Sequence, residues 1–232
     1  TQAHHILILG ASILIPTHSP HNTPILPVKK PDSSYRLVQD LWQINSAIIP
    51  VCPVVPNPYT LLSRIPPNTS HSSVLDLKDA FLTIPVHPFS QNLFAFTWAD
   101  PDTGYSQQLA WTVLPQGFRD SPHYFGQALQ LDLSQLHLQP SILLQYMDDL
   151  LLCSPSLEHC IQHTTRLLHF LSECRYQVSK KKAQLTSPKV SYLGLMITPN
   201  TWEILPAWKQ SIQQIPFPKT KRDLLSFLGL VG

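Results

Sequence analysis

The sequence predicts an α+β fold in which helices back antiparallel strands, and three observations lead to this prediction. Apolar runs of strand length flank Tyr146-Met147-Asp148-Asp149, a pattern typical of a β-hairpin with two carboxylates at its tip. Residues 93–98 and 108–113 are rich in β-branched and aromatic residues, and a loop containing Pro, Asp and Gly joins them. Apolar residues also recur at helical spacing in 125–136 and in 157–171.

The composition indicates a globular domain with little surface charge. Of 232 residues, 43% are hydrophobic, 13% are charged and 23 are proline, which excludes a disordered chain and predicts stiff connections. The net charge of +2 permits nucleic-acid binding without arguing for it.

Nothing in the sequence predicts a membrane span or an export signal, so we expect a cytoplasmic protein. The missing initiator Met and the helix-like pattern at the end suggest a piece of a longer product. The cysteines are expected to be free thiols because they show no CxxC spacing: Cys52, Cys153, Cys160 and Cys174.

The N-terminal third is predicted to contain short strands joined by proline-rich connectors. Residues 22–30 are typical of a strand that ends in two lysines, and 35–38 are typical of a second strand. Asp40 is placed to cap a short helix that runs to Asn45. The next elements are expected in this order: a connector at 50–58, a polar loop at 63–73, a strand at 74–77, a tight turn at 78–80 and a strand at 82–86.

Two helices are predicted, one on either side of the hairpin that carries the two carboxylates. The first begins at Asp120 or Ser121, with Pro122 at its first position, and Pro140 ends it. Its buried face is expected to contain Phe125, Leu129, Leu133 and Leu136. The second is expected to bury Leu157, Ile161, Thr164, Leu168 and Leu171.

The opposite face of the second helix contains two histidines, His159 and His163, with Cys160 and Cys174 nearby. A zinc site would need four ligands at established spacings, and the sequence does not supply them. We therefore interpret this face as exposed and polar.

The C-terminal part is predicted to add a hairpin and a helix. Residues 190–197 are typical of one hairpin arm, turned by 198–200, and 219–230 of a basic amphipathic helix. Lys180-Lys181-Lys182 precede this hairpin. Such a charge run is usually a solvated face, and a phosphate-contacting patch is the alternative.

Asp148 and Asp149 are the strongest candidates for function. Packing does not explain them, because burying two adjacent ionised carboxylates without partners is costly. They either form a turn, which Asp favours, or bind a divalent cation. Asp76 also follows a strand-like stretch, so a strand beside the hairpin would bring all three acids to one sheet edge.

Three such acids predict a specific chemistry, in which a 3′ hydroxyl attacks a triphosphate. They could hold two Mg²⁺ ions about 4 Å apart, with Mn²⁺ as a substitute, and so support an in-line phosphoryl displacement. Lys30 and Arg36 are candidates to neutralise the triphosphate, and the planar fork of Arg suits phosphate oxygens.

Three other motifs are interpreted as local structure. Asp102-Thr103-Gly104 matches the signature of aspartic proteases, but it lies in a polar hairpin loop instead of beside an apolar strand. Residues 24–27 and 53–56 match PxxP, a motif that peptide-binding domains recognise, but such matches are common in protein sequences. The glycosylation sequon Asn68-Thr69-Ser70 lacks an export signal to accompany it.

At these residues the chain resembles a known family, the retroviral reverse transcriptases. Tyr-Met-Asp-Asp at 146–149, Val-Leu-Asp-Leu-Lys-Asp-Ala-Phe at 74–81 and Leu-Pro-Gln-Gly-Phe at 114–118 occur in the family's order and spacing. The similarity is greatest to the gammaretroviral type, as carried by endogenous retroviral pol genes. Four further stretches extend it: 19–30, 55–59, 93–96 and 192–194.

The resemblance implies a right-hand polymerase that extends a primer on an RNA or DNA template with deoxynucleoside triphosphates. No partner protein is predicted. The connection and RNase H regions of the family would lie outside this chain. The implied division is 1–75 mainly fingers, 76–100 palm, 101–125 fingers and palm, 126–205 palm with both hairpins, and 206–232 the start of a truncated thumb.

The resemblance also implies a role for each matching residue. The catalytic acids and metal ligands would be Asp76, Asp148 and Asp149, with the backbone carbonyl of Leu77 as a further metal ligand. The nucleotide would meet Lys30, Arg36, Asp79, Ala80, Gln116 and Phe81, the last as a steric gate against a 2′ hydroxyl. The template-primer would meet Tyr146, Met147, Lys180, Lys181, Lys182, Tyr192, Leu193 and Gly194.

Four residues, at three places in the chain, depart from the family pattern. The family usually has Pro where Leu37 stands, Arg where Trp42 stands, and a basic pair where Ser46-Ala47 stand. These changes remove positive charge near the expected template path, which would weaken nucleic-acid binding. The alternative function is therefore a catalytically inactive endogenous retroviral remnant that at most binds nucleic acid.

Overall fold

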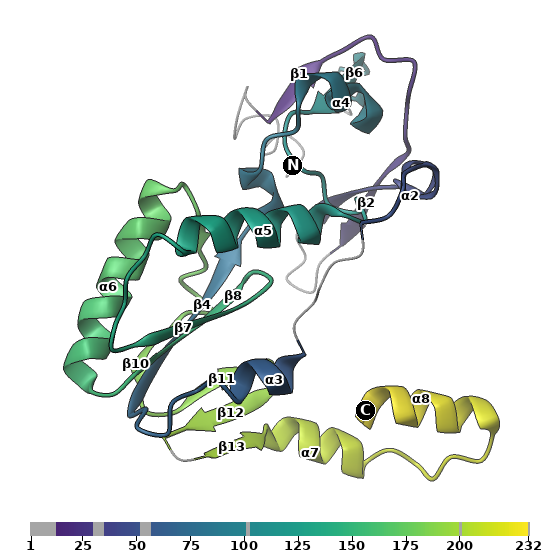
Figure 1. Ribbon diagram of the computed structural model, residues 1–232. Helices are drawn as coiled ribbons and strands as arrows, with labels where there is room; N and C mark the ends of the chain where they lie inside the picture. Colours follow the sequence, from purple (N-terminus) through teal and green to yellow (C-terminus); the bar gives the residue numbers. More distant parts are fainter. Residues whose placement is uncertain (1–12, 30–34, 52–56, 101–102, 200, 232) are drawn as a thin grey trace.

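The computed structural model describes residues 13–29, 35–51, 57–100, 103–199 and 201–231, which mix helices with antiparallel strands (Figure 1). The strands are β1 (Leu14–Pro16), β2 (Ile25–Lys29), β3 (Tyr35–Gln39), β4 (His71–Lys78), β5 (Ala95–Ala99), β6 (Ser106–Trp111), β7 (Ile142–Tyr146), β8 (Asp149–Ser154), β9 (Gln177–Val178), β10 (Gln184–Ser187), β11 (Val190–Tyr192), β12 (Leu195–Thr198) and β13 (Thr201–Ile204). The helices are α2 (Trp42–Ala47), α3 (Pro58–Leu62), α4 (Pro88–Gln91), α5 (Ser121–Leu133), α6 (Leu157–Glu173), α7 (Pro206–Gln213) and α8 (Lys221–Val231), with 3₁₀ helices η1 (Ala80–Thr83) and η2 (Asn92–Phe94). Among these helices, none is both long and apolar enough to cross a bilayer.

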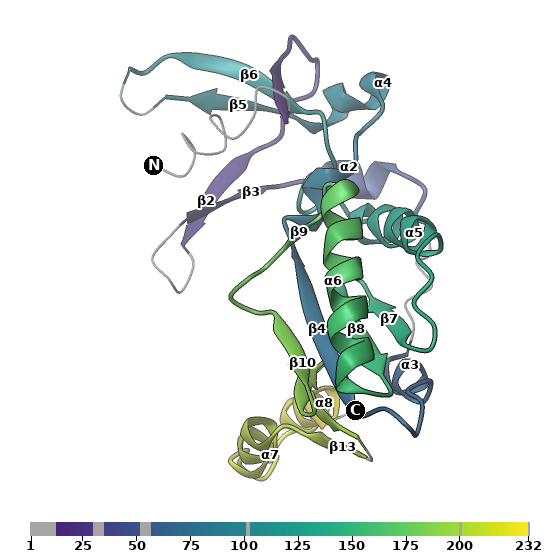
Figure 2. The ribbon, with the colours of Figure 1, turned by 90° about the vertical axis from the view of Figure 1, so that its left-hand side faces the viewer.

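The central sheet has the strand order β10-β4-β8-β7, and β9 pairs with the end of β4. Successive side chains of a strand point to opposite faces, so β4 contributes to two cores. Val74 packs with α3 and the β11–β12 hairpin, whereas Leu75 and Leu77 pack under α5 and α6. The sheet is therefore covered on both faces, and α6 lies along one of them (Figure 2).

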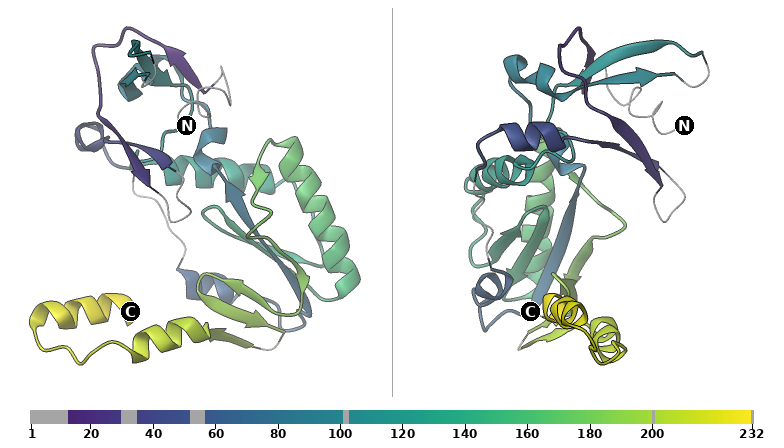
Figure 3. Two further views of the ribbon diagram at one scale, coloured as in Figure 1. Left: turned by 180° about the vertical axis from the view of Figure 1, so that it is seen from behind. Right: turned by 90° about the vertical axis from the view of Figure 1, so that its right-hand side faces the viewer.

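A second, three-stranded sheet has the order β1-β6-β5 and its own core. Phe81 and Ile84 pack against both this core and the core under α5 and α6, so the segment around η1 joins the two parts. The β2–β3 hairpin stands apart as a two-stranded ribbon (Figure 3). The side chain of Gln39 fastens its base by donating to the carbonyl of Phe94 at 3.1 Å.

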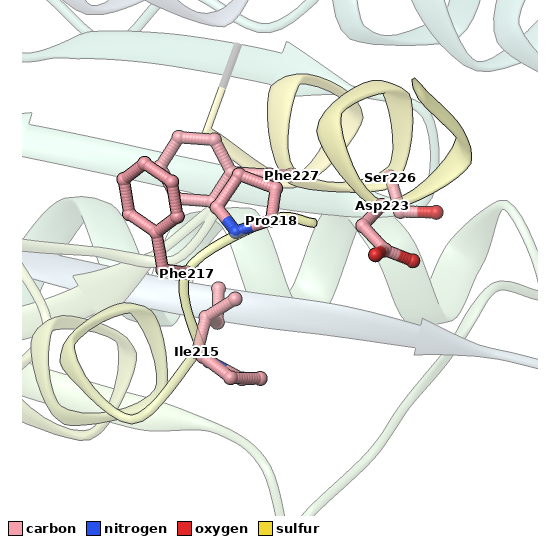
Figure 4. Close-up of a pocket in the computed structure, with 7 residues that line it drawn as sticks. Ile215, Phe217, Pro218, Asp223, Ser226 and Phe227 are labelled. Atoms are coloured by element: carbon pink, nitrogen blue, oxygen red, sulfur yellow. The ribbon is translucent and has the colours of Figure 1, made fainter. Parts of the chain in front are cut away.

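The C-terminal part consists of the β11-β12-β13 sheet followed by α7 and α8, which project from the body (Figure 3). A reciprocal cap starts α8: the Asp223 amide donates to Thr220 Oγ1 at 3.1 Å, and the Thr220 amide donates to Asp223 Oδ2 at 3.0 Å. A pocket of about 250 Å³ lies between α8 and the connector at 215–218 (Figure 4). None of the predicted site residues lines this pocket.

The two predicted hairpins on either side of α5 are confirmed as β5–β6 and β7–β8. The strand expected at 82–86 is wrong. Asp79 has a left-handed φ of 51°, η1 follows, and only Pro85 makes an isolated bridge to Val113. The turn forms because the Leu82 amide donates to the Asp79 carbonyl at 2.9 Å, which withdraws that amide from any sheet.

Three other boundaries also differ from expectation. The polar loop at 63–73 gives way to β4 at His71, because Ser72 and Ser73 are buried in the sheet. The first long helix ends at Leu133, before Pro140. The single arm expected at 190–197 is two strands, since Leu193 and Gly194 have positive φ angles of 50° and 77° and reverse the chain.

The predicted buried face of α6 is partly wrong. Leu157 and Ile161 are 47% and 50% exposed, whereas Cys160 and His163, expected outside, are buried. The reason is a polar layer on the sheet beneath the helix. Ser141 Oγ lies 2.7 Å from His163 Nδ1 and 2.8 Å from Ser154 Oγ, and Ser73 Oγ lies 2.8 Å from Thr164 Oγ1. Burial lowers the pKa of His163, which favours its neutral form.

Candidate active site

Pairing of β4 with β8 brings the predicted acids together at one end of the central sheet. Asp76, near the end of β4, lies directly opposite Asp149, the first residue of β8. The amide of Leu77 donates to the carbonyl of Asp148 at 2.9 Å, which extends the pairing into the hairpin tip. Asp76 and Asp149, which are 73 positions apart in sequence, thus become cross-strand neighbours.

The tip between β7 and β8 is a tight turn. Tyr146 and Asp149 are the last paired residues, and Met147 and Asp148 form the turn between them. Met147 adopts a left-handed φ of 52°, as the first central residue of a two-residue hairpin does. The side chains of all four residues are partly exposed, so a ligand can reach them.

The carboxylates at this edge have a different electrostatic environment from that of an ordinary surface carboxylate. Burial, followed by the negative charges of Asp148 and Asp76, raises the pKa of Asp149 to about 6. Lys182 opposes this shift. Its Nζ lies 2.8 Å from Asp76 Oδ2, and this contact raises the pKa of Lys182. The edge therefore accumulates negative charge that only one nearby cation offsets among the described residues.

The donor atoms at this edge are carboxylate oxygens, a type of ligand that Mg²⁺ and Mn²⁺ prefer. Leu77, whose backbone carbonyl was expected to be a further ligand, has a buried side chain. Their arrangement does not yet form a ligand cluster. In the described part of the chain, no three His, Cys, Asp or Glu side chains converge closely enough to hold a metal ion. This finding applies equally to the zinc alternative at His159 and His163.

The residues expected to bind the nucleotide lie on different elements. Asp79 is at the left-handed turn after β4, beside Lys78 at 3.5 Å, and Ala80 is buried behind it. Phe81 is half-buried and makes an edge-to-face contact with Phe125, with ring centroids 5.9 Å apart.

The remaining residues expected to bind the nucleotide lie before or after this turn in the chain. Gln116 is exposed in the loop before α5. Its neighbour Gly117 has a φ of 96°, and a Cβ there would lie 3.2 Å from the Gln39 carbonyl, so glycine lets this loop lie against β3. Arg36 lies on β3 opposite Val28. Lys30 lies outside the described residues, as does Asp102 of the protease alternative.

The residues expected to bind template-primer divide into an outer and an inner group. Lys180 and Lys181 are exposed, and Leu193 and Gly194 form the turn between β11 and β12. Tyr192, in contrast, is only 3% exposed, and its hydroxyl donates to the Asp149 carbonyl at 3.2 Å. This hydrogen bond fastens the β11–β12 hairpin to the edge of the central sheet that holds the three acids.

The sequence did not predict several of the hydrogen bonds that hold this site together. It did not identify the contacts of Lys182 with Asp76 or of Tyr192 with Asp149. It also missed Asn45, whose side chain donates to the Gly117 carbonyl at 2.9 Å and accepts from the Arg119 amide at 2.9 Å. The partners are 43 to 106 positions apart, so local pattern contains no signal for them.

Comparison with known proteins identifies the family. The family model for reverse transcriptase (RNA-dependent DNA polymerase) matches residues 28–197. The chain is 49% identical over 227 residues to the Gag-Pol polyprotein of Gibbon ape leukemia virus, covering 97% of this chain and 14% of the relative. It is 52% identical over 226 residues to that of Avian reticuloendotheliosis virus, covering 96% and 20%. The Pol polyprotein of Feline endogenous virus ECE1 is 47% identical, covering 100% and 22%.

Solved structures agree with the sequence comparisons. A foamy viral protease-reverse transcriptase in complex with dsDNA matches with a TM-score of 0.83 at 30% identity, covering 99% of this chain and 46% of that chain. The same protein in complex with an RNA/DNA hybrid matches with a TM-score of 0.78 at 30% identity, covering 99% and 30%. The chain thus spans only 14% to 22% of the length of these viral polyproteins. The resemblance is confirmed, together with the polymerase fold, and the chain belongs to the reverse transcriptase family.

Proposed function

We propose that this chain catalyses RNA-directed DNA synthesis, adding deoxynucleoside triphosphates to a primer 3′ end on an RNA or DNA template. The observation that carries the proposal is the pairing of Asp76 with Asp149 beside Asp148 at the tip. Burial, followed by the negative charges of Asp148 and Asp76, raises the pKa of Asp149 to about 6. A bound cation would offset this concentration of negative charge.

Asp76, Asp148, Asp149 and the carbonyl of Leu77 are proposed to hold Mg²⁺ or Mn²⁺. When bound, these ions would supply the positive charge that activates the 3′ hydroxyl and offsets the charge of the leaving pyrophosphate. The chain's own task is to hold the oxygen ligands. β4 and β8 do so from a sheet whose neighbouring side chains, Leu75 and Leu150, are fully buried.

The nucleotide pocket is proposed to lie between the end of β4 and the β2–β3 hairpin. Arg36 and Lys30 would neutralise the triphosphate, and Gln116 would line the pocket. Asp79 and Ala80 would contribute backbone groups. Phe81 would stack under the deoxyribose and exclude a 2′ hydroxyl, and its contact with Phe125 supports a fixed ring position.

Template-primer is proposed to pass over Tyr146, Met147, Lys180, Lys181, Lys182 and the turn at 192–194. The foamy viral relatives in complexes with dsDNA and with an RNA/DNA hybrid support this proposal. The associated division is 1–75 mainly fingers, 76–100 palm, 101–125 fingers and palm, 126–205 palm, and 206–232 the start of the thumb.

Extension of a primed RNA template tests the proposal, with the chain compared to its Asp148→Asn variant. We expect incorporation that depends on Mg²⁺ and is lost in the variant. Equal incorporation by both proteins would refute the catalytic assignment. Salt-sensitive binding of template-primer without turnover would instead favour the inactive remnant. Asp102→Asn tests the protease alternative, which is removed if this variant leaves every activity unchanged.

A further inference from the structure

Lys182 makes a contact at the catalytic edge that the assignment of three acids does not use. Its Nζ lies 2.8 Å from Asp76 Oδ2, and the lysine side chain is 69% exposed while that of Asp76 is 16% exposed. We propose that Lys182 competes with the divalent cation for Asp76, so that a cation binds all three acids only after displacing this ammonium. The inference rests on the metal site of the proposed function.

Backbone hydrogen bonds position the turn that carries Lys182 next to Asp76. The amide of Ser179 donates to the carbonyl of Asp76 at 2.8 Å, and the amide of Lys182 donates to the carbonyl of Ser179 at 3.1 Å. Val178 pairs with Leu77, the residue after Asp76. The turn that carries the lysine is therefore fastened to the backbone of the carboxylate that the lysine holds.

The contact occupies an oxygen of one of the three acids. Asp76 and Asp149 are cross-strand neighbours, and among the described residues no group of three acidic, histidine or cysteine side chains could hold a metal ion. The ammonium engages Asp76 Oδ2, so this oxygen becomes available to a cation once Lys182 releases it.

The exposure of Lys182 suits a competitor. Exposed ion pairs are weak, because water screens the charges and a long side chain loses freedom in making them. A divalent cation with several carboxylate ligands can displace such an ammonium. Lys182 therefore reduces cation affinity without preventing binding, and it neutralises Asp76 whenever no cation does.

Binding of Mn²⁺ alone to the 232-residue chain, followed by electron paramagnetic resonance of free Mn²⁺, tests the proposal. Lys182→Met removes the charge and keeps the apolar stem, and we expect it to tighten Mn²⁺ binding about three- to fivefold. Lys181→Met is the matched control from the same turn, and its affinity should stay within about twofold of the wild type. Lys182→Gln repeats the measurement should the methionine variant misfold.

Two further variants separate this inference from the proposed function. Asp76→Asn should weaken Mn²⁺ binding by about tenfold or more, and Lys182→Met should have no additional effect in that background. If Asp76→Asn leaves binding unchanged, the metal site itself is refuted. If Asp76→Asn weakens binding but Lys182→Met leaves it unchanged or weaker, only the competition is refuted.

Discussion

The central sheet and the β2–β3 hairpin carry residues assigned to one reaction, yet the two regions differ in how deeply their side chains are buried. Beneath the acids, Leu75, Leu150 and Leu151 are fully buried between cores on both faces of the sheet. The hairpin is a two-stranded ribbon on which Leu26 and Val28 are 61% and 40% exposed. Packing is thus concentrated under the carboxylates.

The difference follows from what each group must do. Ligands of a metal ion must be held within a few tenths of an ångström, whereas a cation that neutralises a triphosphate acts over several ångströms. Two-stranded ribbons are marginally stable alone, so the hairpin can adjust its position at little cost. We therefore expect changes in the sheet to alter the chemical step and changes in the hairpin to alter substrate affinity.

The largest effect is expected from Asp149→Asn, which should lower primer extension by about 10³-fold. The same variant should be more stable than the wild type near neutral pH. A carboxyl whose folded pKa is raised stabilises the fold at low pH, and that contribution is lost as pH rises through about 6. Thermal unfolding at pH 5 and pH 8 checks this, and an equal or lower melting temperature of the variant at pH 8 would contradict it.

In the hairpin, Arg36→Ala should raise the KM for deoxynucleoside triphosphates by about 10- to 100-fold, because a charge-assisted contact to phosphate is lost. The turnover rate should change much less, and the melting temperature should not change. Steady-state kinetics with Lys29→Ala, an exposed cation of the partner strand, provide the control. If Arg36→Ala lowers only the turnover rate and leaves KM unchanged, the expectation that hairpin residues set substrate affinity would be wrong.

Phe81 packs against both the core under α5 and α6 and the core of the β1-β6-β5 sheet. Its variant therefore distinguishes a role in nucleotide selection from a role in packing alone. Phe81→Val should lower discrimination against ribonucleotides by about tenfold or more, since the clash with a 2′ hydroxyl is relieved. It should also cost about 1–2 kcal/mol of stability through the lost contact with Phe125. Lower stability with unchanged discrimination would mean that Phe81 is only a core residue.

The smallest effect is expected from Tyr192→Phe, which removes the hydrogen bond to the Asp149 carbonyl and keeps the ring. We expect a two- to tenfold loss of primer extension, the size of one neutral hydrogen bond. Tyr176→Phe is the matched control, because it removes a partly buried hydrogen bond of 2.7 Å to Asp132, which is none of the three acids. Equal losses of activity in both variants would show a general stability effect instead of positioning.

The local sequence pattern predicted a strand or hairpin correctly where turn-forming residues separate two apolar stretches. The Asp pair between apolar arms predicted β7–β8, and the Pro-Asp-Gly loop predicted β5–β6. Pattern was wrong where a polar residue faced inward. Apolar spacing placed Leu157 and Ile161 inside and His163 outside, but Leu157 and Ile161 are half-exposed and His163 is buried against the hydroxyl of Ser141.

The sequence by itself identified the candidate acids, because burying two adjacent carboxylates in an apolar run is costly unless they form a turn or bind a cation. Only the tertiary structure decided which groups surround them. The register of β4 against β8 sets Asp76 opposite Asp149, the turn after β9 brings Lys182 to Asp76, and the β11–β12 hairpin brings Tyr192 to Asp149. Contacts between distant segments depend on how whole elements pack, and no short stretch of sequence encodes that packing.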